Sequence, residues 1–422
     1  MPPKKYIKID GVTQINPAYK AYEQAHGRAA TSALNPERAL VVVSNMEQHQ
    51  QLREVSLGAG QGDVILASAT DATIEMIQEP EIYRQVGLSP DAMVDSLGAI
   101  FAKYEIPMGL MNKLSALTEY DGLQFIIDDS GSMRQHSNAK NSSGQLQTRW
   151  EEAHSRMKEL IEIMAYVPTP KITICFLNRK DTIHLERRGE SPETFINDTY
   201  RQLDKAFFPG PSGSTPIVRC LTDSFARDFG KRIARYLFCD GMPDGGDVAK
   251  ETIMNMVAKR SNPQGNPLTF LSCTDEDDQV EWMKEVEERA SYCAEYDDFY
   301  DEAKEVLRDQ GAVLPFTKGF HLIGQLVGAM NPDDLDALDE SVPLTKWTLD
   351  NILGVQTTEQ EYRKYFEGFK EAQGKRILNS NIDRLKVGQD WEPFFGEFMF
   401  QPLAKNIAAV RQFKQQLEQC AP

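Results

Sequence analysis

Two aspartates and two serines follow directly on an apolar run in the first third of the chain. The apolar residues 125–127 lead into Asp128-Asp129-Ser130-Gly131-Ser132. Carboxylate and hydroxyl oxygens are the ligands that hard cations such as Mg²⁺ prefer in proteins. This pattern therefore indicates a metal site at the end of a buried strand.

Two further loops carry oxygen-bearing side chains of the same kind. Thr215 precedes Pro216 in the segment PGPSGSTPI, and Asp240 ends the apolar segment YLFCD. A threonine followed by proline also predicts a helix N-cap, which would hold the hydroxyl in a fixed direction. Because imidazole and thiolate are missing from this set, zinc and copper are disfavoured and Mg²⁺ is expected. The predicted metal ligands are Asp128, Ser130, Ser132, Thr215 and Asp240.

Short apolar runs alternate with helical patterns through the middle of the chain. The expected strands are residues 123–127, 171–178, 232–240 and 267–273, with an edge strand at 181–189 and a last strand at 311–317. Strands that are apolar throughout and separated by helices are typical of a mostly parallel sheet covered on both faces. Residues 120–330 are therefore predicted to form a doubly wound α/β unit. In such sheets, ligands bind outside the carboxyl ends of the strands, where Asp128 and Asp240 are expected.

Helix start signals support this alternation. Residues 148–151 read Thr-Arg-Trp-Glu, a capping box, and apolar residues at helical spacing follow as far as Met164. Ser191 and Pro192 predict the start of a second helix. Further helices are expected over residues 246–260, 281–290, 299–309 and 320–330.

The two flanks are predicted to be mainly helical additions to this unit. Residues 1–119 are expected as an N-terminal accessory region of mixed α/β character, with apolar runs in 38–68 and two short helices divided at Pro107. Residues 331–422 are expected as a C-terminal helical region, with an apolar stripe near its end.

The three oxygen-rich motifs, in this order, resemble the metal-ion-dependent adhesion site of von Willebrand factor A (vWA) domains. The resemblance covers about half of the chain and implies a Rossmann-like sheet that binds Mg²⁺ or Mn²⁺. It also implies direct coordination by Ser130, Ser132 and Thr215, with Asp128 and Asp240 acting through water. The chain departs from the family pattern in its threonine loop, which reads Ser-Gly-Ser-Thr, and in the polar segment 134–147 that separates the first motif from its helix.

The resemblance implies a protein-binding function. A metal with one open coordination position attracts a carboxylate from another molecule. The expected role is a non-catalytic, metal-dependent interaction module or scaffold whose protein partner supplies an Asp or Glu. Residues 134–147, 178–190 and 209–214 are expected to form the rim of the site.

Two other interpretations stay open. Asp128, Ser130 and Ser132 by themselves are also typical of a strand-to-loop turn with local side-chain to backbone hydrogen bonds. An aspartate after an apolar strand, together with Mg²⁺, also describes a phosphotransfer enzyme of the aspartyl phosphatase type, with Asp128 as nucleophile. Such enzymes need a second carboxylate two residues later, where this chain has Ser130. No set of nucleophile, base and oxyanion donors can be assembled elsewhere, so no catalytic residue is predicted.

Composition limits the class of partner and the expected location. The net charge of −17 disfavours sequence-independent binding to nucleic acid or to anionic membranes. No apolar stretch is long enough for a membrane helix, and the first residues lack the apolar core of a signal peptide. A cytoplasmic protein is expected, with delivery into another cell without a cleaved signal peptide as an alternative.

Several other features are expected to be structural. The six cysteines lack a C-x-x-C pair and are expected to be reduced packing residues. His321 is expected to be a hydrogen-bonded core histidine. The acidic segment 275–309 is expected to form a solvated helical face, and the aromatic segment 391–400 to be buried.

Overall fold

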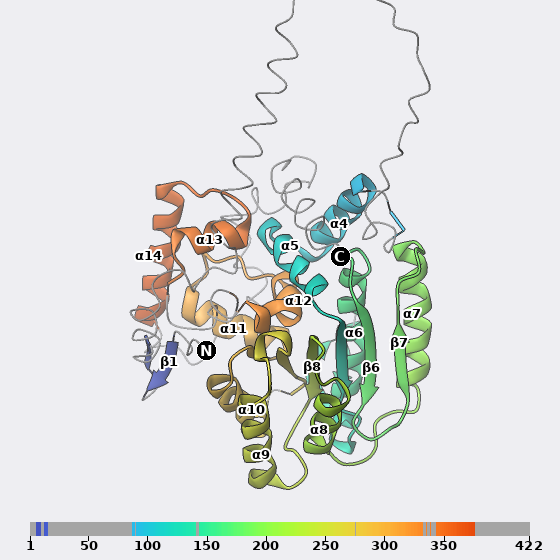
Figure 1. The fold of residues 1–422 in the computed structure, drawn as a ribbon. Helices are drawn as coiled ribbons and strands as arrows, with labels where there is room; N and C mark the ends of the chain where they lie inside the picture. The colour runs from blue at the N-terminus through green and yellow to red at the C-terminus, as the bar shows by residue number, and fades with distance from the viewer. Residues whose placement is uncertain are drawn as a thin grey trace, which may run out of the picture. The chain divides into compact units, whose positions relative to one another are not determined.

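The computed structural model describes residues 6–9, 12–15, 87–88, 90–140, 143–274, 276–331, 335, 338 and 343–375. The chain divides into two compact units, residues 1–10 with 14–78 and residues 11–13 with 79–422. Near the start of the chain, β1 (Tyr6–Ile9) and β2 (Val12–Ile15) pair as a two-stranded sheet. The remaining described elements belong to the second unit (Figure 1).

A six-stranded sheet forms the centre of the second unit. Its strands run in the order β10-β9-β8-β3-β6-β7, and all neighbours pair in parallel except β7, which is antiparallel to β6 at one edge. The predicted α/β class, the mostly parallel sheet and the antiparallel edge strand are therefore confirmed. The strands are β3 (Gly122–Ile127), β6 (Lys171–Phe176), β7 (Thr182–Leu185), β8 (Ile233–Cys239), β9 (Leu268–Ser272) and β10 (Cys293–Tyr296).

Helices cover both faces of the sheet, so the central strands are buried along their whole length. Side chains alternate across a strand, so Phe125 and Ile127 of β3 face one apolar cluster and Ile126 faces another. The first cluster also contains residues of α6 (Arg149–Met164), α7 (Pro192–Phe207) and α12 (Lys318–Val327). The second contains residues of α8 (Ile217–Arg227), α9 (Gly246–Ala258) and α10 (Asp277–Arg289).

The predicted caps of two helices are present. Thr148 and Glu151 form the reciprocal capping box at the start of α6, with the Thr148 backbone N–H 2.8 Å from a Glu151 carboxylate oxygen. Ser191 caps α7, and Pro192 occupies its first turn. The capping box fixes the first residue of α6, and this sets the direction in which the Arg149 side chain points.

One predicted strand is absent from the structure, and one observed strand of the six-stranded sheet was not predicted. Residues 311–317 do not form a strand: Gly311 has a positive φ of 85°, Leu314 donates to the Gly311 carbonyl, and Thr317 caps α12. The sixth strand is β10 instead, which lies inside the acidic segment 275–309 between α10 and α11 (Phe299–Gln310). Four residues are too few for periodicity to distinguish them from the helical patterns on either side.

Parts of both flanks pack on the same apolar core as the sheet. α4 (Pro90–Tyr104) and α5 (Met108–Leu114) are divided near Pro107 as predicted, and α13 (Lys346–Leu353) and α14 (Glu359–Lys375) follow residue 331. The core cluster includes Leu110 of α5 and Leu349 of α13. The apolar stripe near the C-terminus, the runs in 38–68 and the segment 391–400 lie outside the described residues.

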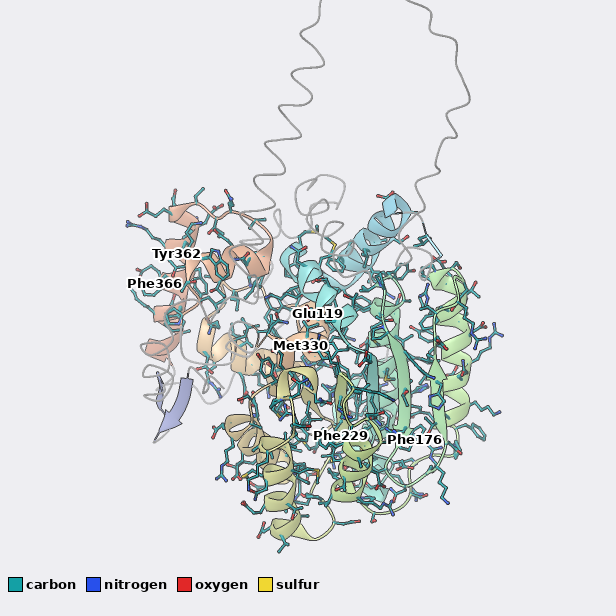
Figure 2. The ribbon with its side chains drawn as sticks, viewed as in Figure 1. Glu119, Phe176, Phe229, Met330, Tyr362 and Phe366 are labelled. Atoms are coloured by element: carbon teal, nitrogen blue, oxygen red, sulfur yellow. The ribbon has the colours of Figure 1, made fainter. Side chains whose placement is uncertain are left out.

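Aromatic side chains line one side of α14. Tyr362 and Phe366, one turn apart, stack with their ring centroids 6.5 Å apart (Figure 2). The Tyr362 hydroxyl donates to the Leu344 carbonyl at 3.0 Å, which fastens the helix to the segment before α13. Among the described helices, none combines the length and apolar character needed to cross a bilayer.

Candidate metal centre

Asp128 and Asp240 lie side by side because the strands that precede them are neighbours. Strand β3 pairs with β8 in parallel register, with Ile127 opposite Phe238. The Asp128 backbone N–H continues this ladder by donating to the Phe238 carbonyl at 2.9 Å. Both aspartates are at most 1% exposed. The predicted position at the carboxyl edge of the sheet is therefore observed for both carboxylates.

A chain of hydrogen bonds connects the two serines to Asp240. The Ser130 backbone N–H donates to Asp128 Oδ1 at 2.8 Å, which turns the chain into the short helix η3 (Gly131–Arg134). The Ser130 and Ser132 hydroxyl oxygens are 2.9 Å apart, and Ser132 donates to Asp240 Oδ1 at 2.9 Å. Four of the five predicted ligands thus lie in one contiguous cluster.

The Thr215 loop is fastened to the same edge through backbone contacts. The Gly131 N–H donates to the Gly213 carbonyl at 3.1 Å, and the Ser212 N–H donates to the Asp129 carbonyl at 2.7 Å. Gly213 has a φ of 126°, and a Cβ at this position would lie 2.6 Å from the Asn178 side chain. Only glycine therefore satisfies both the backbone conformation and the close approach.

Thr215 does not cap α8, and the N-cap prediction is wrong. The N-cap residue is Pro216, and no side chain caps this helix. Thr215 instead exchanges backbone hydrogen bonds with the next loop: its N–H donates to Asp244 Oδ1 at 3.0 Å, and its carbonyl accepts from the Asp244 N–H at 2.9 Å. Because the loop holds Thr215 through its backbone, the hydroxyl keeps its capacity to act as a ligand.

Sequence reasoning missed Asp129, which organises the loops without joining the cluster. Asp129 is 1% exposed and accepts hydrogen bonds from the Asn178 backbone N–H at 2.8 Å and from Arg179 Nε at 3.1 Å. Asn178 also donates through its side chain to the Ser214 carbonyl at 2.7 Å. The end of β6 is thereby tied to both the first motif and the threonine loop.

Sequence reasoning also missed Arg149, the first residue of α6. Its guanidinium is 3% exposed, donates to Asp240 Oδ2 at 3.0 Å, and reaches Glu276 Oε1 at 2.7 Å. The Arg149 backbone N–H donates to the Gln135 carbonyl at 2.8 Å. The capping box was visible in the sequence, but no pattern indicated that the arginine inside it returns to the carboxyl edge of the sheet.

The cluster holds buried carboxyl groups close together. Burial, and then the charge of Asp240, raise the pKa of Asp128 to about 7. The Cys239 thiol, whose own pKa burial raises, donates to Asp128 Oδ2 at 3.3 Å. One arginine offsets one of the two buried carboxylates, so Asp128 keeps a negative charge only at a cost in free energy. A cation beside it would favour the charged form.

The donor set fits a hard divalent cation and not a soft one. The cluster offers two carboxylates and two hydroxyls, and Thr215 in the adjoining loop carries a third hydroxyl, which suits the oxygen preference of Mg²⁺. No group of three or more His, Cys, Asp or Glu side chains is placed to hold a metal within the part of the chain that the structure describes. A cation held here would need the hydroxyls as direct ligands, and Ser130 and Ser132 would exchange their mutual hydrogen bond for coordination.

Comparisons with known proteins do not identify a family. No family model and no curated protein matches the sequence. Among solved structures, the chain is similar to the PilB minor pilin from Streptococcus sanguinis, with 11% identity and a TM-score of 0.32; the match covers 42% of this chain and 56% of the pilin. It is also similar to an uncharacterized membrane spanning protein from Vibrio fischeri, with 13% identity and a TM-score of 0.16, covering 46% of this chain and all of that one. Similarity this low carries no functional argument.

Proposed function

We propose that this protein is a metal-dependent protein-binding module of the vWA type. The observation that carries the proposal is the position of Ser132, whose hydroxyl oxygen lies 2.9 Å from both the Ser130 hydroxyl oxygen and Asp240 Oδ1. This contact joins the loops after β3 and β8 and brings hydroxyl and carboxylate oxygens together at one edge of the sheet. The threonine loop is bonded to the first of these loops.

The residues divide into two roles. Ser130, Ser132 and Thr215 would coordinate Mg²⁺ or Mn²⁺ directly, whereas Asp128 and Asp240 would accept hydrogen bonds from water on the ion. Because the direct ligands are neutral, the ion keeps much of its charge and polarises a carboxylate that binds to it. The protein partner would supply this carboxylate from an Asp or Glu side chain.

The rim of the site is built from the three predicted segments. Arg134 Nε donates to the Pro211 carbonyl at 2.9 Å, which joins segments 134–147 and 209–214. The Asn178 side chain, at the start of segment 178–190, donates to the Ser214 carbonyl. A rim tied together in this way can present a fixed surface to the partner, which limits the ordering entropy lost on binding.

A phosphatase role for Asp128 has less support. Asp128 is 0% exposed, and both of its carboxylate oxygens accept hydrogen bonds, from the Ser130 N–H and from the Cys239 thiol. A nucleophile has to reach the phosphorus atom of its substrate. Such an enzyme needs an acid-base carboxylate two residues after Asp128. This chain has Ser130 there, and its hydroxyl is hydrogen-bonded to the Ser132 hydroxyl. Asp128 is better placed to orient water.

Calorimetry on the full chain tests the metal site. The wild-type protein, stripped with a chelator, should take up one Mg²⁺ or Mn²⁺, and Thr215→Val should weaken uptake by about tenfold or more. Ser214→Ala, which removes an exposed hydroxyl from the same loop, is the matched control and should bind as the wild type does. Folded wild-type protein that binds neither ion at millimolar concentration would refute the proposal.

A second experiment tests the binding of a partner carboxylate. Proteins captured from lysate in Mg²⁺ should be released by EDTA and absent with Asp128→Ala. For an identified partner, replacing the carboxylate that binds the ion should cost several kcal/mol, because a central desolvated contact dominates binding. Capture that is equal with Mg²⁺ and EDTA contradicts a metal-dependent interface.

A further inference from the structure

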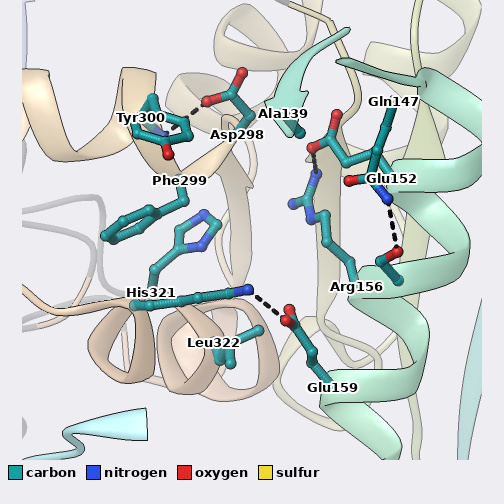
Figure 3. Close-up of a pocket in the computed structure, with 12 residues that line it drawn as sticks. Ala139, Gln147, Glu152, Arg156, Glu159, Asp298, Phe299, Tyr300, His321 and Leu322 are labelled. Atoms are coloured by element: carbon teal, nitrogen blue, oxygen red, sulfur yellow. Dashed lines mark hydrogen bonds and ion pairs between the residues drawn. The ribbon is translucent and has the colours of Figure 1, made fainter. Parts of the chain in front are cut away.

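A pocket of about 470 Å³ lies beside α6, and none of the predicted metal ligands lines it (Figure 3). Its walls come from α6, the start of α11 and the start of α12, with Ala139 and Gln147 contributed by the hairpin between β4 (His136–Lys140) and β5 (Leu146–Thr148). Cavities of this size are typical of small-molecule sites. The lining combines buried charges with the Phe299 ring.

Arg156 lines this pocket and carries two buried donors without a partner. Its side chain is 7% exposed, and its Nη1 contacts both the Ser272 carbonyl and Glu152 Oε1, the latter at 3.6 Å. The buried Nε and Nη2 atoms have no hydrogen-bond partner among the described residues. The face of the guanidinium lies 5.4 Å from the centre of the Phe238 ring, which holds the group in place. Figure 3 shows the guanidinium directed from α6 toward His321.

The two unpartnered donors lie on one edge of the guanidinium, and this edge matches a carboxylate. Nε and one Nη form a planar fork that donates two parallel hydrogen bonds to two oxygens of one group. Buried donors without a partner are rare in native proteins because each costs free energy. A ligand carboxylate would satisfy both.

The other charges around the pocket require that the ligand also carries a cation. Glu152 and Asp298 are 4% and 3% exposed and line the pocket. Glu152 is ion-paired with Arg156, and Lys318 is ion-paired with Glu159. Burial, and then the charge of Arg156, hold the pKa of His321 well below the usual range. The ring is therefore neutral, although its Nε2 lies 3.0 Å from the Asp297 carbonyl. A ligand anion without a positive group would therefore meet the negative charge of Glu152, and that of Asp298 once Asp298 ionises above about pH 7.

We propose that this pocket binds a small zwitterion of the α-amino acid class. The ligand carboxylate takes the Nε and Nη2 donors of Arg156, and the ligand ammonium group lies against Glu152 and Asp298. The ligand side chain contacts Phe299 and Leu322 on the wall formed by α11 and α12. This site uses none of the proposed metal ligands and requires no metal, although Ala139 and Gln147 belong to the rim segment 134–147.

Thermal shift and calorimetry on the full chain in EDTA test the proposal. At least one of the common amino acids should raise the melting temperature and bind by calorimetry. Two analogues of that amino acid should each bind about tenfold more weakly or worse. One is the carboxylic acid that lacks the amine, and the other is the amide that lacks the charged carboxylate. The proposal is overturned if no amino acid binds, or if the amine-free acid or inorganic phosphate binds as tightly as the amino acid.

Two variants locate the site. Arg156→Lys keeps the charge and removes the planar fork, so amino acid affinity should fall about tenfold or more. Arg260→Lys is the matched control, because Arg260 is also buried but donates to carbonyl oxygens elsewhere, including Asn266 and Tyr292. If Arg156→Lys does not fold, Ser155→Leu serves in its place, because it fills the pocket from a half-buried position on α6. Wild-type affinity in the folded Arg156 variant, or in the Ser155 variant, refutes the assignment.

Discussion

Arg149 donates a hydrogen bond of 3.0 Å to Asp240, so a fixed positive charge lies at the edge of the predicted metal centre. The guanidinium is 3% exposed and the Asp240 carboxylate 0% exposed, so water screens this pair only weakly. The same carboxylate accepts from Ser132 through its other oxygen. Arg149 therefore stabilises Asp240 in the charged form and also opposes the approach of a second cation.

Replacing Arg149 by methionine should separate these two effects. Without the arginine, Asp240 is a buried carboxylate without its ion pair, and the free energy of unfolding in EDTA should fall by about 3 to 5 kcal/mol. Mg²⁺ affinity should rise, because a repulsive charge has been removed. Urea unfolding and calorimetry measure the two quantities. Weaker Mg²⁺ binding by the folded variant would contradict this account.

Arg235→Met provides the control for that experiment. Arg235 is fully buried near the start of β8, where it lies 3.6 Å from Asp228, at the opposite end of the strand from Asp240. Its replacement should also destabilise the fold but leave Mg²⁺ affinity unchanged. A similar gain in affinity in both variants would show that the effect is not local.

Two glycines in the threonine loop form a matched pair for testing its geometry. Gly210→Ala and Gly213→Ala both place a side chain at positive φ, 73° and 126°, but only at Gly213 would the Cβ clash with Asn178. At Gly210 nothing lies within 4 Å. We expect Gly213→Ala to displace Thr215 and lower Mg²⁺ affinity by about tenfold or more, with little change for Gly210→Ala. Equal losses would assign the effect to backbone strain in general.

Tyr236 should contribute to stability through a buried hydrogen bond. Its hydroxyl donates to the Leu326 carbonyl at 2.7 Å and ties β8 to α12, and its ring stacks on Phe125 at 4.5 Å. Tyr236→Phe keeps the stack and leaves that carbonyl without this donor, at an expected cost of about 1 to 3 kcal/mol in urea unfolding.

Tyr200→Phe is the control for the Tyr236 variant. The Tyr200 hydroxyl donates to the Lys158 carbonyl at 3.1 Å, but Tyr200 is half-buried, so water can take over the acceptor. Its cost should stay below about 1 kcal/mol. If the two variants lost equal stability, burial would not explain the importance of the Tyr236 contact.

Asp298 should give the stability of the protein a pH dependence. Burial, followed by the charges of Asp301 and Glu152, raises the pKa of Asp298 to about 7. Because the pKa in the unfolded chain is about 3.9, the folded state holds a proton that the unfolded state has already released. Stability from this group is therefore lost as pH rises from about 4 to about 7, and the loss is complete above that range.

Asp298→Asn tests the pH dependence because asparagine also caps a helix and does not titrate. The stability of the variant relative to wild type, measured by urea unfolding, should increase across this pH window and level off above about pH 7. Asp247→Asn, at a carboxylate that is 94% exposed, should show no such trend. A constant difference between Asp298→Asn and wild type would show that Asp298 titrates normally.

The sequence predicted the sheet, and the position of Asp128 and Asp240 at its carboxyl edge, because both depend on local signals. Apolar runs without alternation identified β3, β6, β8 and β9, and a residue at the end of such a run lies at the carboxyl edge. By that rule, Asp128 and Asp240 lie side by side at this edge once β3 and β8 are neighbours. The predicted N-cap of α8 was wrong because the Thr215 backbone is hydrogen-bonded to Asp244 instead. Asp244 is 29 residues away, so a local sequence pattern does not encode this contact.

The remaining features depend on contacts between distant segments. Arg149 and Asp240 are 91 residues apart, and nothing in the spacing of either indicates the other. The pocket around Arg156 needs α6 packed beside the starts of α11 and α12, which lie more than a hundred residues later. The unpartnered donors of Arg156 are notable only because the residue is buried, which the sequence does not show. The same arginine on an exposed helical face would be hydrogen-bonded to water.

The hairpin of β4 and β5 is closed at its base, where the Arg149 N–H donates to the Gln135 carbonyl. At its far end, Gly144 is exposed, and a Cβ there would meet nothing within 4 Å. Because the base is bonded, a change at the tip need not move Ser132 or α6. Gly144 has a φ of 77°, so a side chain there strains the backbone of the tip itself. A fluorophore attached at Gly144 would stand within the rim segment and report when another protein arrives.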